Sequence, residues 1–185
     1  LLRQARDLAI AIEDRVMEAR ATTLLNQALA SSLRRIEAQG LVEDTWSRAA
    51  GHLPDPHVIR LQRQMAGNAR RLGDPERWAT LLEQVLLQSE RIGNAELVFE
   101  ALYNKGSSYS EMGRLIEGIA ILESVIDAAP GLGREDLALN AQVNLAAASM
   151  DLDPRGCLEI NRSLIDAGRR TGDRSLLLVG TGAMF

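Results

Sequence analysis

The sequence predicts an all-α fold of stacked antiparallel helix pairs, and three observations support that prediction. Apolar residues recur at helical spacing, most clearly over residues 97–109 and 115–126. A pattern the length of one helix pair repeats about every forty residues. Aromatic residues make up only 3% of a chain that is 46% hydrophobic, so its core must come from many small contacts between helices.

The clearest single helix pair spans residues 94–130. Gly113 separates its two apolar stripes, as a helix C-cap would, and Pro130 cannot continue the second helix. Neither helix can bury its apolar stripe alone, so the pair needs further pairs on both sides. No segment elsewhere shows the sustained alternation of apolar and polar residues that a half-buried strand requires.

The repeat becomes visible when this pair is moved along the chain. Two apolar residues followed by an acid stand at 41–43, 81–83 and 121–123, and another apolar pair stands at 1–2. Matches that keep one spacing throughout are rarely due to chance. We therefore expect a single repeat domain, residues 1–185, with repeats at about 15–54, 55–94, 95–134 and 135–173 and a half-repeat at each end.

Local signals then give the helix boundaries. Asp55-Pro56, Asp74-Pro75 and Asp153-Pro154 each offer an N-cap carboxylate followed by a first-turn proline, and Gly40 is a weak point inside a helix. The period predicts about nine helices. Helical spacing itself marks ten segments, which cover residues 1–13, 15–32, 35–51, 56–71 and 75–92, two segments within 94–130, and residues 135–150, 154–170 and 174–185.

Residues 94–130 resemble the tetratricopeptide repeat. The small residues, tyrosine, turn glycine, large apolar residue and closing proline of that family have counterparts at its spacings: Gly106, Gly118, Tyr109, Gly113, Leu122 and Pro130. Trp78 departs from the pattern, because it stands where a small residue is expected. The resemblance implies a right-handed superhelical solenoid of helix pairs and a non-catalytic role in binding a protein or peptide.

The longer period is similar to the tetratricopeptide-like arrays of large bacterial regulators, including LuxR-type activators, signal-transducing ATPases and nucleotide cyclases. That similarity implies a cytoplasmic sensor or interaction module in signalling or transcription regulation. The alternative is an intramolecular scaffold or oligomerisation segment of such a regulator. Because the chain opens on Leu1 in the middle of a predicted helix, we interpret it as a piece of a longer protein.

The composition of the chain limits the classes of partner that it is expected to bind. A net charge of -4 and a pI near 5.3 argue against direct binding to nucleic acid, which needs a basic surface. Cys157 is the only cysteine, so the chain can form no internal disulfide, and a reducing cytoplasmic setting fits it. The apolar segment near the C-terminus is too short to span a bilayer, so no membrane association is expected.

No catalytic residue, metal site or cofactor is expected, and the chain is not predicted to be an enzyme. His52, Asp55 and His57 share a proline-rich loop, but they offer few ligands and no geometry that aims them at one ion. Cys157 stands where the repeat places a small packing residue. The glycine pairs at 131–133 and 180–182 complete no phosphate-binding motif.

One helix face is the predicted binding surface. In solenoids of helix pairs, the first helix of each pair lines the concave side, where ligands usually bind. The partner-binding residues expected there are Arg20, Gln27, Arg60, Arg63, Arg70, Tyr103 and Ser107. Its arginines predict an acidic or C-terminal peptide segment as the ligand. The alternative is that acids such as Glu100 already neutralise them.

The terminal helices are expected to expose apolar stripes that a neighbouring helix would otherwise cover. We therefore expect a homo-oligomer to form through these exposed terminal helices. The residues expected to make that contact at the C-terminal end are Leu176, Leu177, Leu178 and Phe185.

Overall fold

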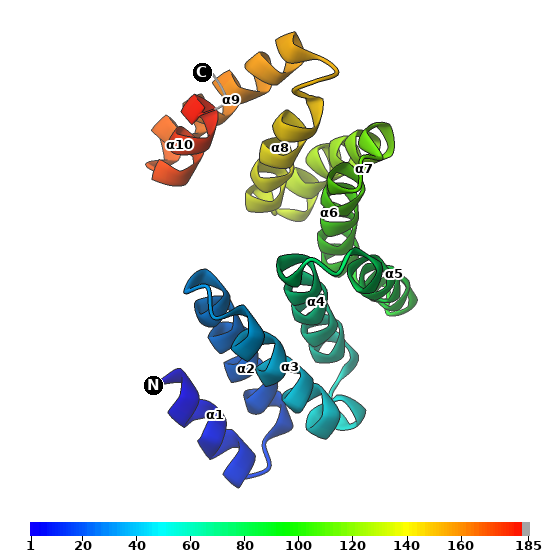
Figure 1. Cartoon of the computed structure of the whole chain (residues 1–185), viewed down its shortest axis with the longest axis vertical. Coiled ribbons are helices and arrows are strands. Elements are labelled where there is room, and N and C mark those ends of the chain that lie inside the picture. The colour runs from blue at the N-terminus through cyan, green and yellow to red at the C-terminus, as the bar shows by residue number, and fades with distance from the viewer. Residues whose placement is uncertain (183–185) are drawn as a thin grey trace. The chain divides into compact units, whose positions relative to one another are not determined.

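A computed structural model describes residues 1–182, and they are almost entirely helical (Figure 1). No strand occurs among these residues, which confirms the predicted all-α class; ten α-helices are present against about nine expected. The α-helices are α1 (Leu2–Ala11), α2 (Arg15–Ser31), α3 (Arg35–Ala49), α4 (Asp55–Leu72), α5 (Pro75–Arg91), α6 (Ala95–Glu111), α7 (Leu115–Ala128), α8 (Glu135–Ser149), α9 (Pro154–Thr171) and α10 (Arg174–Gly182). Two short 3-10 turns are η1 (Ala50–His52) and η2 (Ala129–Leu132).

The chain forms two compact units, Leu1–Leu97 and Val98–Phe185. In the first unit α2 packs against α1, α3 and α4, and α4 packs against α5. In the second unit α8 packs between α7 and α9, and α10 packs against α9. Each helix thus buries its apolar stripe against its neighbours along the chain, as a repeat of helix pairs requires. Within residues 1–182 no helix is long and apolar enough to cross a membrane.

The Asp-Pro signals predict two of three helix starts correctly. Asp74 accepts a hydrogen bond from the backbone N–H of Arg77 at 3.0 Å, and Asp153 does the same for Gly156 at 3.0 Å. Asp55 is not the N-cap of its helix, so that prediction is wrong. The carbonyl of Pro54 already accepts the backbone N–H of His57 at 2.9 Å, which makes Pro54 the N-cap and places Asp55 in the first turn.

The turns also follow the predicted signals. Gly113 has φ 80°, a left-handed conformation that ends α6, and Pro130 lies in the 3-10 turn just after α7. Leu33 takes the same left-handed conformation, with φ 59°, at the turn between α2 and α3. A branched side chain there costs conformational energy that glycine avoids.

Gly106 and Gly118 bring α6 and α7 into close contact, as their spacing predicts. A Cβ added to Gly118 would lie 2.8 Å from the carbonyl oxygen of Gly106, closer than such atoms can stand. A Cβ added to Gly106 would lie 3.0 Å from Cγ of Leu122, which is fully buried. Two small residues facing each other therefore set the distance between these helices.

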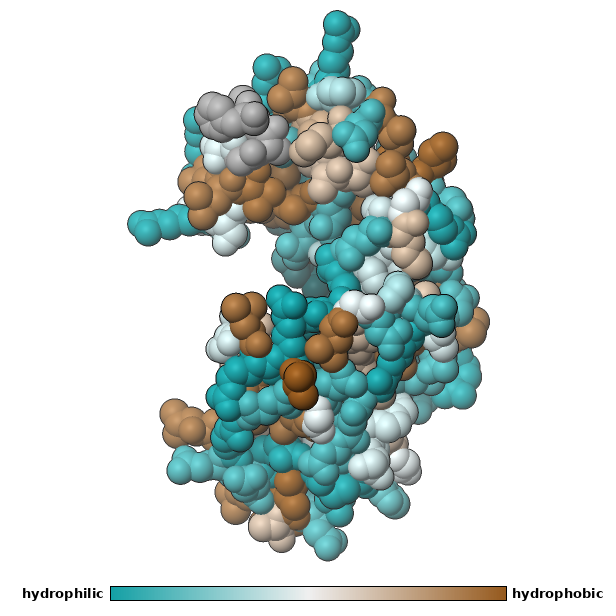
Figure 2. Space-filling view, viewed as in Figure 1, coloured by the Kyte–Doolittle hydropathy of each residue, from teal (hydrophilic) through white to brown (hydrophobic). Residues whose placement is uncertain are grey.

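The structure also revises the expected contacts of the C-terminal helix. Leu176 is buried against Leu164 and Ala167, so it is not available for self-association. Leu178 is exposed, and Figure 2 shows apolar surface gathered where α10 lies. Phe185 lies outside the described residues.

A substitution at Gly118 tests the close approach of α6 and α7. Gly118→Ala places a methyl group against the Gly106 backbone, and we expect it to lower the free energy of unfolding by about 1 to 3 kcal/mol. The matched control is Gly40→Ala in α3, where an added Cβ meets nothing within 4 Å. That control should stabilise the protein by about 0.5 to 1 kcal/mol. Equal effects of the two substitutions in urea unfolding would contradict the packing described.

Candidate functional site

Buried amide side chains join α2 to α4. Asn26 donates through Nδ2 to Oε1 of Gln64 at 2.7 Å, and Asn68 donates through Nδ2 to Oδ1 of Asn26 at 2.8 Å. All three side chains are buried. A buried amide that loses its partner costs about 1 to 3 kcal/mol, so these two bonds hold α2 and α4 in one register. We use the name α2–α4 face for the surface of α2 and α4 beside the contact of Asn26 with Gln64 and Asn68.

The second unit uses a similar contact at the matching place in the repeat. Asn144 of α8 donates through Nδ2 to the hydroxyl oxygen of Tyr103 at 3.1 Å and to Oγ of Ser107 at 2.7 Å. Asn144 stands two repeats after Gln64. In both units, polar side chains thus connect the first helix of one pair to the first helix of the next.

A pocket of about 390 Å³ opens on the α2–α4 face, toward the N-terminal ends of the two helices. Apolar atoms and cationic groups share its wall. Leu24 is 53% exposed, so it offers apolar surface to a ligand in the pocket. The lining residues are Ala19, Arg20, Thr23 and Leu24 from α2 and His57 and Arg60 from α4.

The pocket carries positive charge that the described part of the chain does not neutralise. Within residues 1–182 no carboxylate forms an ion pair with Arg20 or Arg60. The pKa of His57 is lowered, first by burial and then by the positive charges of Arg60 and Arg20. Both effects favour the neutral form of the imidazole. Such a pocket suits an anion next to an apolar group.

The other predicted binding residues lie at different places. Gln27 is exposed on α2, and Arg63 is half-buried on α4. The guanidinium carbon of Arg70 lies 5.3 Å from the ring centre of Trp78, a cation–π contact with α5. Tyr103 and Ser107 belong to the second unit, where they bond to Asn144. Of the predicted residues, the structure brings Arg20 and Arg60 together in one pocket.

Acids in the second unit have arginine partners of their own. Glu100 accepts a hydrogen bond from Nη1 of Arg134 at 2.9 Å, and Nη2 of Arg134 reaches Asp136 at 2.8 Å. These contacts raise the pKa of Arg134, with Asp136 as the largest cause and Glu100 as the next. Arg134 therefore remains charged at every pH at which the protein folds.

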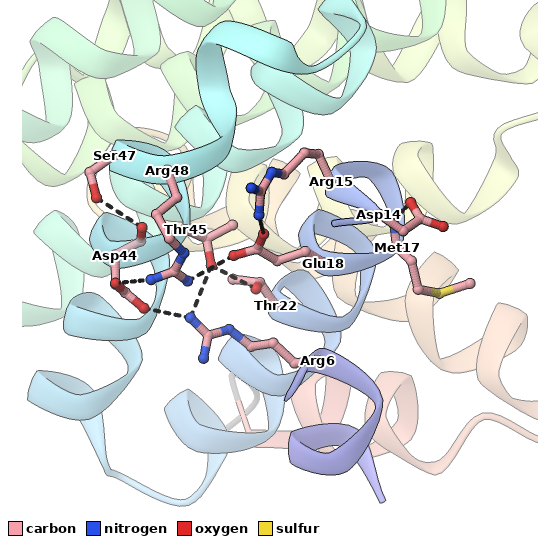
Figure 3. Close-up of polar contacts among 10 residues, drawn as sticks. All are labelled: Arg6, Asp14, Arg15, Met17, Glu18, Thr22, Asp44, Thr45, Ser47 and Arg48. Atoms are coloured by element: carbon pink, nitrogen blue, oxygen red, sulfur yellow. Dashed lines mark hydrogen bonds and ion pairs between the residues drawn. The ribbon is translucent and has the colours of Figure 1, made fainter. Parts of the chain in front are cut away.

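An ionic cluster centred on the buried Glu18 joins α2 to α3 (Figure 3). Glu18 is fully buried and pairs with Nη1 of Arg15 at 3.2 Å and Nη2 of Arg48 at 2.7 Å. The adjacent residue, Ala19, lines the pocket. Removing Arg48 would leave a buried carboxylate with a single partner, which is costly, so α2 and α3 are firmly attached here.

The same cluster attaches α1. Nη2 of Arg6 reaches Asp44 of α3 at 2.5 Å and Thr45 at 3.4 Å, and the hydroxyl of Thr45 shares a hydrogen bond of 2.9 Å with Thr22 of α2. Asp44 also pairs with Arg48. Figure 3 shows these side chains converging from three helices. The pKa of Asp44 is lowered, because its bonds to Arg48 and Arg6 outweigh the effect of burial.

The sequence patterns did not predict the ionic cluster around Glu18 or the amide contact between α2 and α4. Glu18 stands at the repeat position that Val58 and Val98 occupy, so an acid within an apolar stripe was the available signal. Asn26 and Asn68 gave a similar signal, as amides on the buried side of predicted helices.

Cys157 is confirmed as a packing residue. Its side chain is buried, and its thiol donates to the carbonyl oxygen of Ala146 at 3.2 Å. His52 is exposed in η1, whereas His57 lines the pocket. Within residues 1–182 no group of three or more His, Cys, Asp or Glu side chains is arranged to hold a metal ion.

Comparison with known proteins supports the repeat fold. No family model matches the chain, and no curated protein matches it. Two crystal structures are similar to it, both of a Podosopora anserina protein assigned as a kinesin light chain with nearly identical TPR-like repeats. One is a single-substitution variant, with 19% identity, a TM-score of 0.64 and coverage of 92% of this chain and 85% of that one. The other has 19% identity, a TM-score of 0.55 and coverage of 97% and 83%.

Likeness at this identity establishes the fold alone. It confirms the tetratricopeptide-like repeat of helix pairs that residues 94–130 predict. The likeness extends over more than nine-tenths of this chain in both alignments.

The pH dependence of stability tests the environment of His57. Its pKa is lower in the folded protein than in the unfolded chain, so folding favours the neutral ring. The free energy of unfolding should therefore be largest above the unfolded pKa of about 6.5 and fall as the pH drops below it. Urea unfolding between pH 7.5 and pH 5, above the range of the acids, should show this fall. His57→Gln should reduce the slope, and an identical slope in both proteins would contradict the lowered pKa of His57.

Proposed function

We propose that this chain is a non-catalytic interaction module that binds an acidic, extended segment of a partner protein at the α2–α4 pocket. The observation that carries the proposal is the pair of guanidinium groups of Arg20 and Arg60. They face one pocket, and no carboxylate within residues 1–182 pairs with them. Two cations that repel each other beside a partly buried histidine are stabilised when an anion binds between them.

The pocket wall indicates which acidic segments fit. Guanidinium groups donate paired hydrogen bonds that match the two oxygens of a carboxylate. Leu24 and Ala19 add an apolar surface that suits an aliphatic side chain next to the acid. The preferred ligand is thus an aspartate or glutamate, or a C-terminal carboxylate, beside an apolar residue. Its association should weaken as salt rises, because exposed charges are screened.

We place this module in the cytoplasm, in a larger bacterial protein that serves signalling or transcription regulation. The support is the similarity in period to the repeat arrays of such regulators. The alternative is a scaffold that contacts other domains of its own parent protein. Binding of an added acidic peptide by the isolated chain favours the first proposal, and no binding favours the second.

Self-association through the terminal helices stays a separate proposal. Leu8 and Ile12 at the end of α1 and Leu178 of α10 are exposed and apolar. Sedimentation of the chain over a range of concentrations tests it. A monomer at every concentration would contradict it.

Substitution of the two pocket arginines tests the proposed site. The probe is a labelled, acetylated and amidated peptide with one aspartate beside a leucine, titrated by fluorescence polarisation. Arg20→Gln and Arg60→Gln should each weaken binding about tenfold, which corresponds to roughly 1.4 kcal/mol for one charge-assisted contact. Stability should not fall, because neither arginine takes part in an ion pair within residues 1–182.

The matched control is Arg162→Gln on the exposed side of α9, which changes the net charge equally. It should leave the affinity unchanged. Equal losses in all three variants would mean that the peptide responds only to net charge. Lost stability with intact binding would show that the two arginines are structural and would contradict the proposal.

A further inference from the structure

Arg71 holds its guanidinium over the α2–α4 contact. Its Nη1 lies 3.4 Å from Oδ1 of Asn68, the residue whose amide bonds to Asn26 of α2. The same nitrogen lies 3.1 Å from the point where a Cβ on Gly67 would stand. Glycine at position 67 therefore leaves room for the guanidinium to lie back along α4. Although Arg71 is in the last turn of that helix, its charge is placed one turn earlier.

No acid in the described chain neutralises this group. Within residues 1–182 neither Arg71 nor Arg35 forms an ion pair with a carboxylate. Arg35 of α3 instead donates through Nη1 to the carbonyl oxygen of Arg71 at 3.2 Å, which brings a second guanidinium close. The pKa of Arg71 is lowered, chiefly by burial and further by the charges of Arg70 and Arg35. A partly desolvated cation next to like charges gains more from a bound anion than a solvated one does.

The position of Arg71 relative to the pocket is fixed by α4. Arg60 and Gly67 are two helical turns apart and lie on the same face. The rise of an α-helix makes their separation about 10 Å. An extended peptide advances about 3.3 Å per residue, so it covers that distance in about three residues.

We propose that Arg71, with Arg35 beside it, forms a second anion-binding position on the α2–α4 face. It takes a carboxylate side chain of the same partner segment, about three residues from the acid held by Arg20 and Arg60. This inference rests on the proposed function and deepens it. The partner is then defined by two acids at a set spacing rather than by negative charge alone. Because Asn68 is fixed by its bond to Asn26, Arg71 is already oriented before the partner arrives.

Two synthetic peptides test the spacing. Both are acetylated and amidated and carry a leucine next to the first aspartate. One has a second aspartate three residues on, and the other has asparagine there. Wild-type protein should bind the two-acid peptide about tenfold more tightly than the one-acid peptide, the ratio expected for one further charge-assisted contact. The ratio of the two affinities is the measured quantity, because it cancels effects common to both peptides.

Substitutions then test whether Arg71 is the cause of that affinity ratio. Arg71→Gln should bring the ratio close to one and leave the affinity for the one-acid peptide unchanged. Gly67→Ala gives a second variant that keeps every charge but puts a methyl group 3.1 Å from Nη1 of Arg71. The guanidinium then has to shift from its position over α4, so this variant should also reduce the ratio. Alanine favours the helix, so loss of folding cannot account for that result. Arg162→Gln should keep the wild-type ratio.

The outcomes separate the two claims. If Arg60→Gln weakens both peptides while Arg71→Gln and Gly67→Ala keep the tenfold ratio, the second position is overturned and the pocket stands. If Arg60→Gln changes neither affinity while Arg71→Gln removes the ratio, the pocket is overturned, and Arg71 is an anion-binding position of its own. A wild-type ratio of one overturns the second position directly.

Discussion

The hydrogen bonds of Asn26 to Gln64 and Asn68 are the interactions on which the proposed site depends. They are buried, and they join two helices that belong to successive pairs. Apolar packing alone is tolerant of small shifts between helices, whereas an amide that loses its partner inside the protein costs free energy at once. Arg20 of α2 and Arg60 of α4 can share one pocket because this contact fixes the two helices against each other. Arg71 is oriented by a residue of the same contact.

Arginines in the first unit have two different roles, since some pair with acids inside the protein and others do not. Arg6 and Arg48 are tied to Asp44 and Glu18, and together they attach α1 and α3 to α2. A chain with a net charge of -4 has acids enough to pair with many of its arginines. On the α2–α4 face, by contrast, Arg20, Arg60 and Arg71 form no ion pair with a carboxylate within residues 1–182, and they lie beside a pocket and a buried amide contact. Positive charge without a partner lowers stability by repulsion, and a bound anion relieves that repulsion.

The fold could be predicted from sequence because it rests on spacing. The period of the repeat, the facing glycines at 106 and 118 and the caps at Asp74 and Asp153 are all local or periodic patterns. Asp55 shows the limit of such rules, since the carbonyl of Pro54 started the helix one residue earlier than the Asp-Pro signal implied.

The site was harder to predict. Helical spacing placed Arg60 and Arg70 on one face, but it could not show that Trp78, at an atypical position in the repeat, attracts Arg70 toward α5. Nor could it show that Arg71 folds back over Gly67. Such contacts depend on side-chain conformations and on pairs of residues far apart in sequence.

The central claim is that the partner binds on the α2–α4 face. The most direct measurement follows the side-chain Nε–Hε signals of the arginines by NMR while the two-acid peptide is added. The signals of Arg20, Arg60 and Arg71 should shift together and saturably, while the signal of Arg134, already paired with Glu100 and Asp136, should not move. Shifts confined to the second unit, or spread evenly over the exposed arginines of both units, would contradict it.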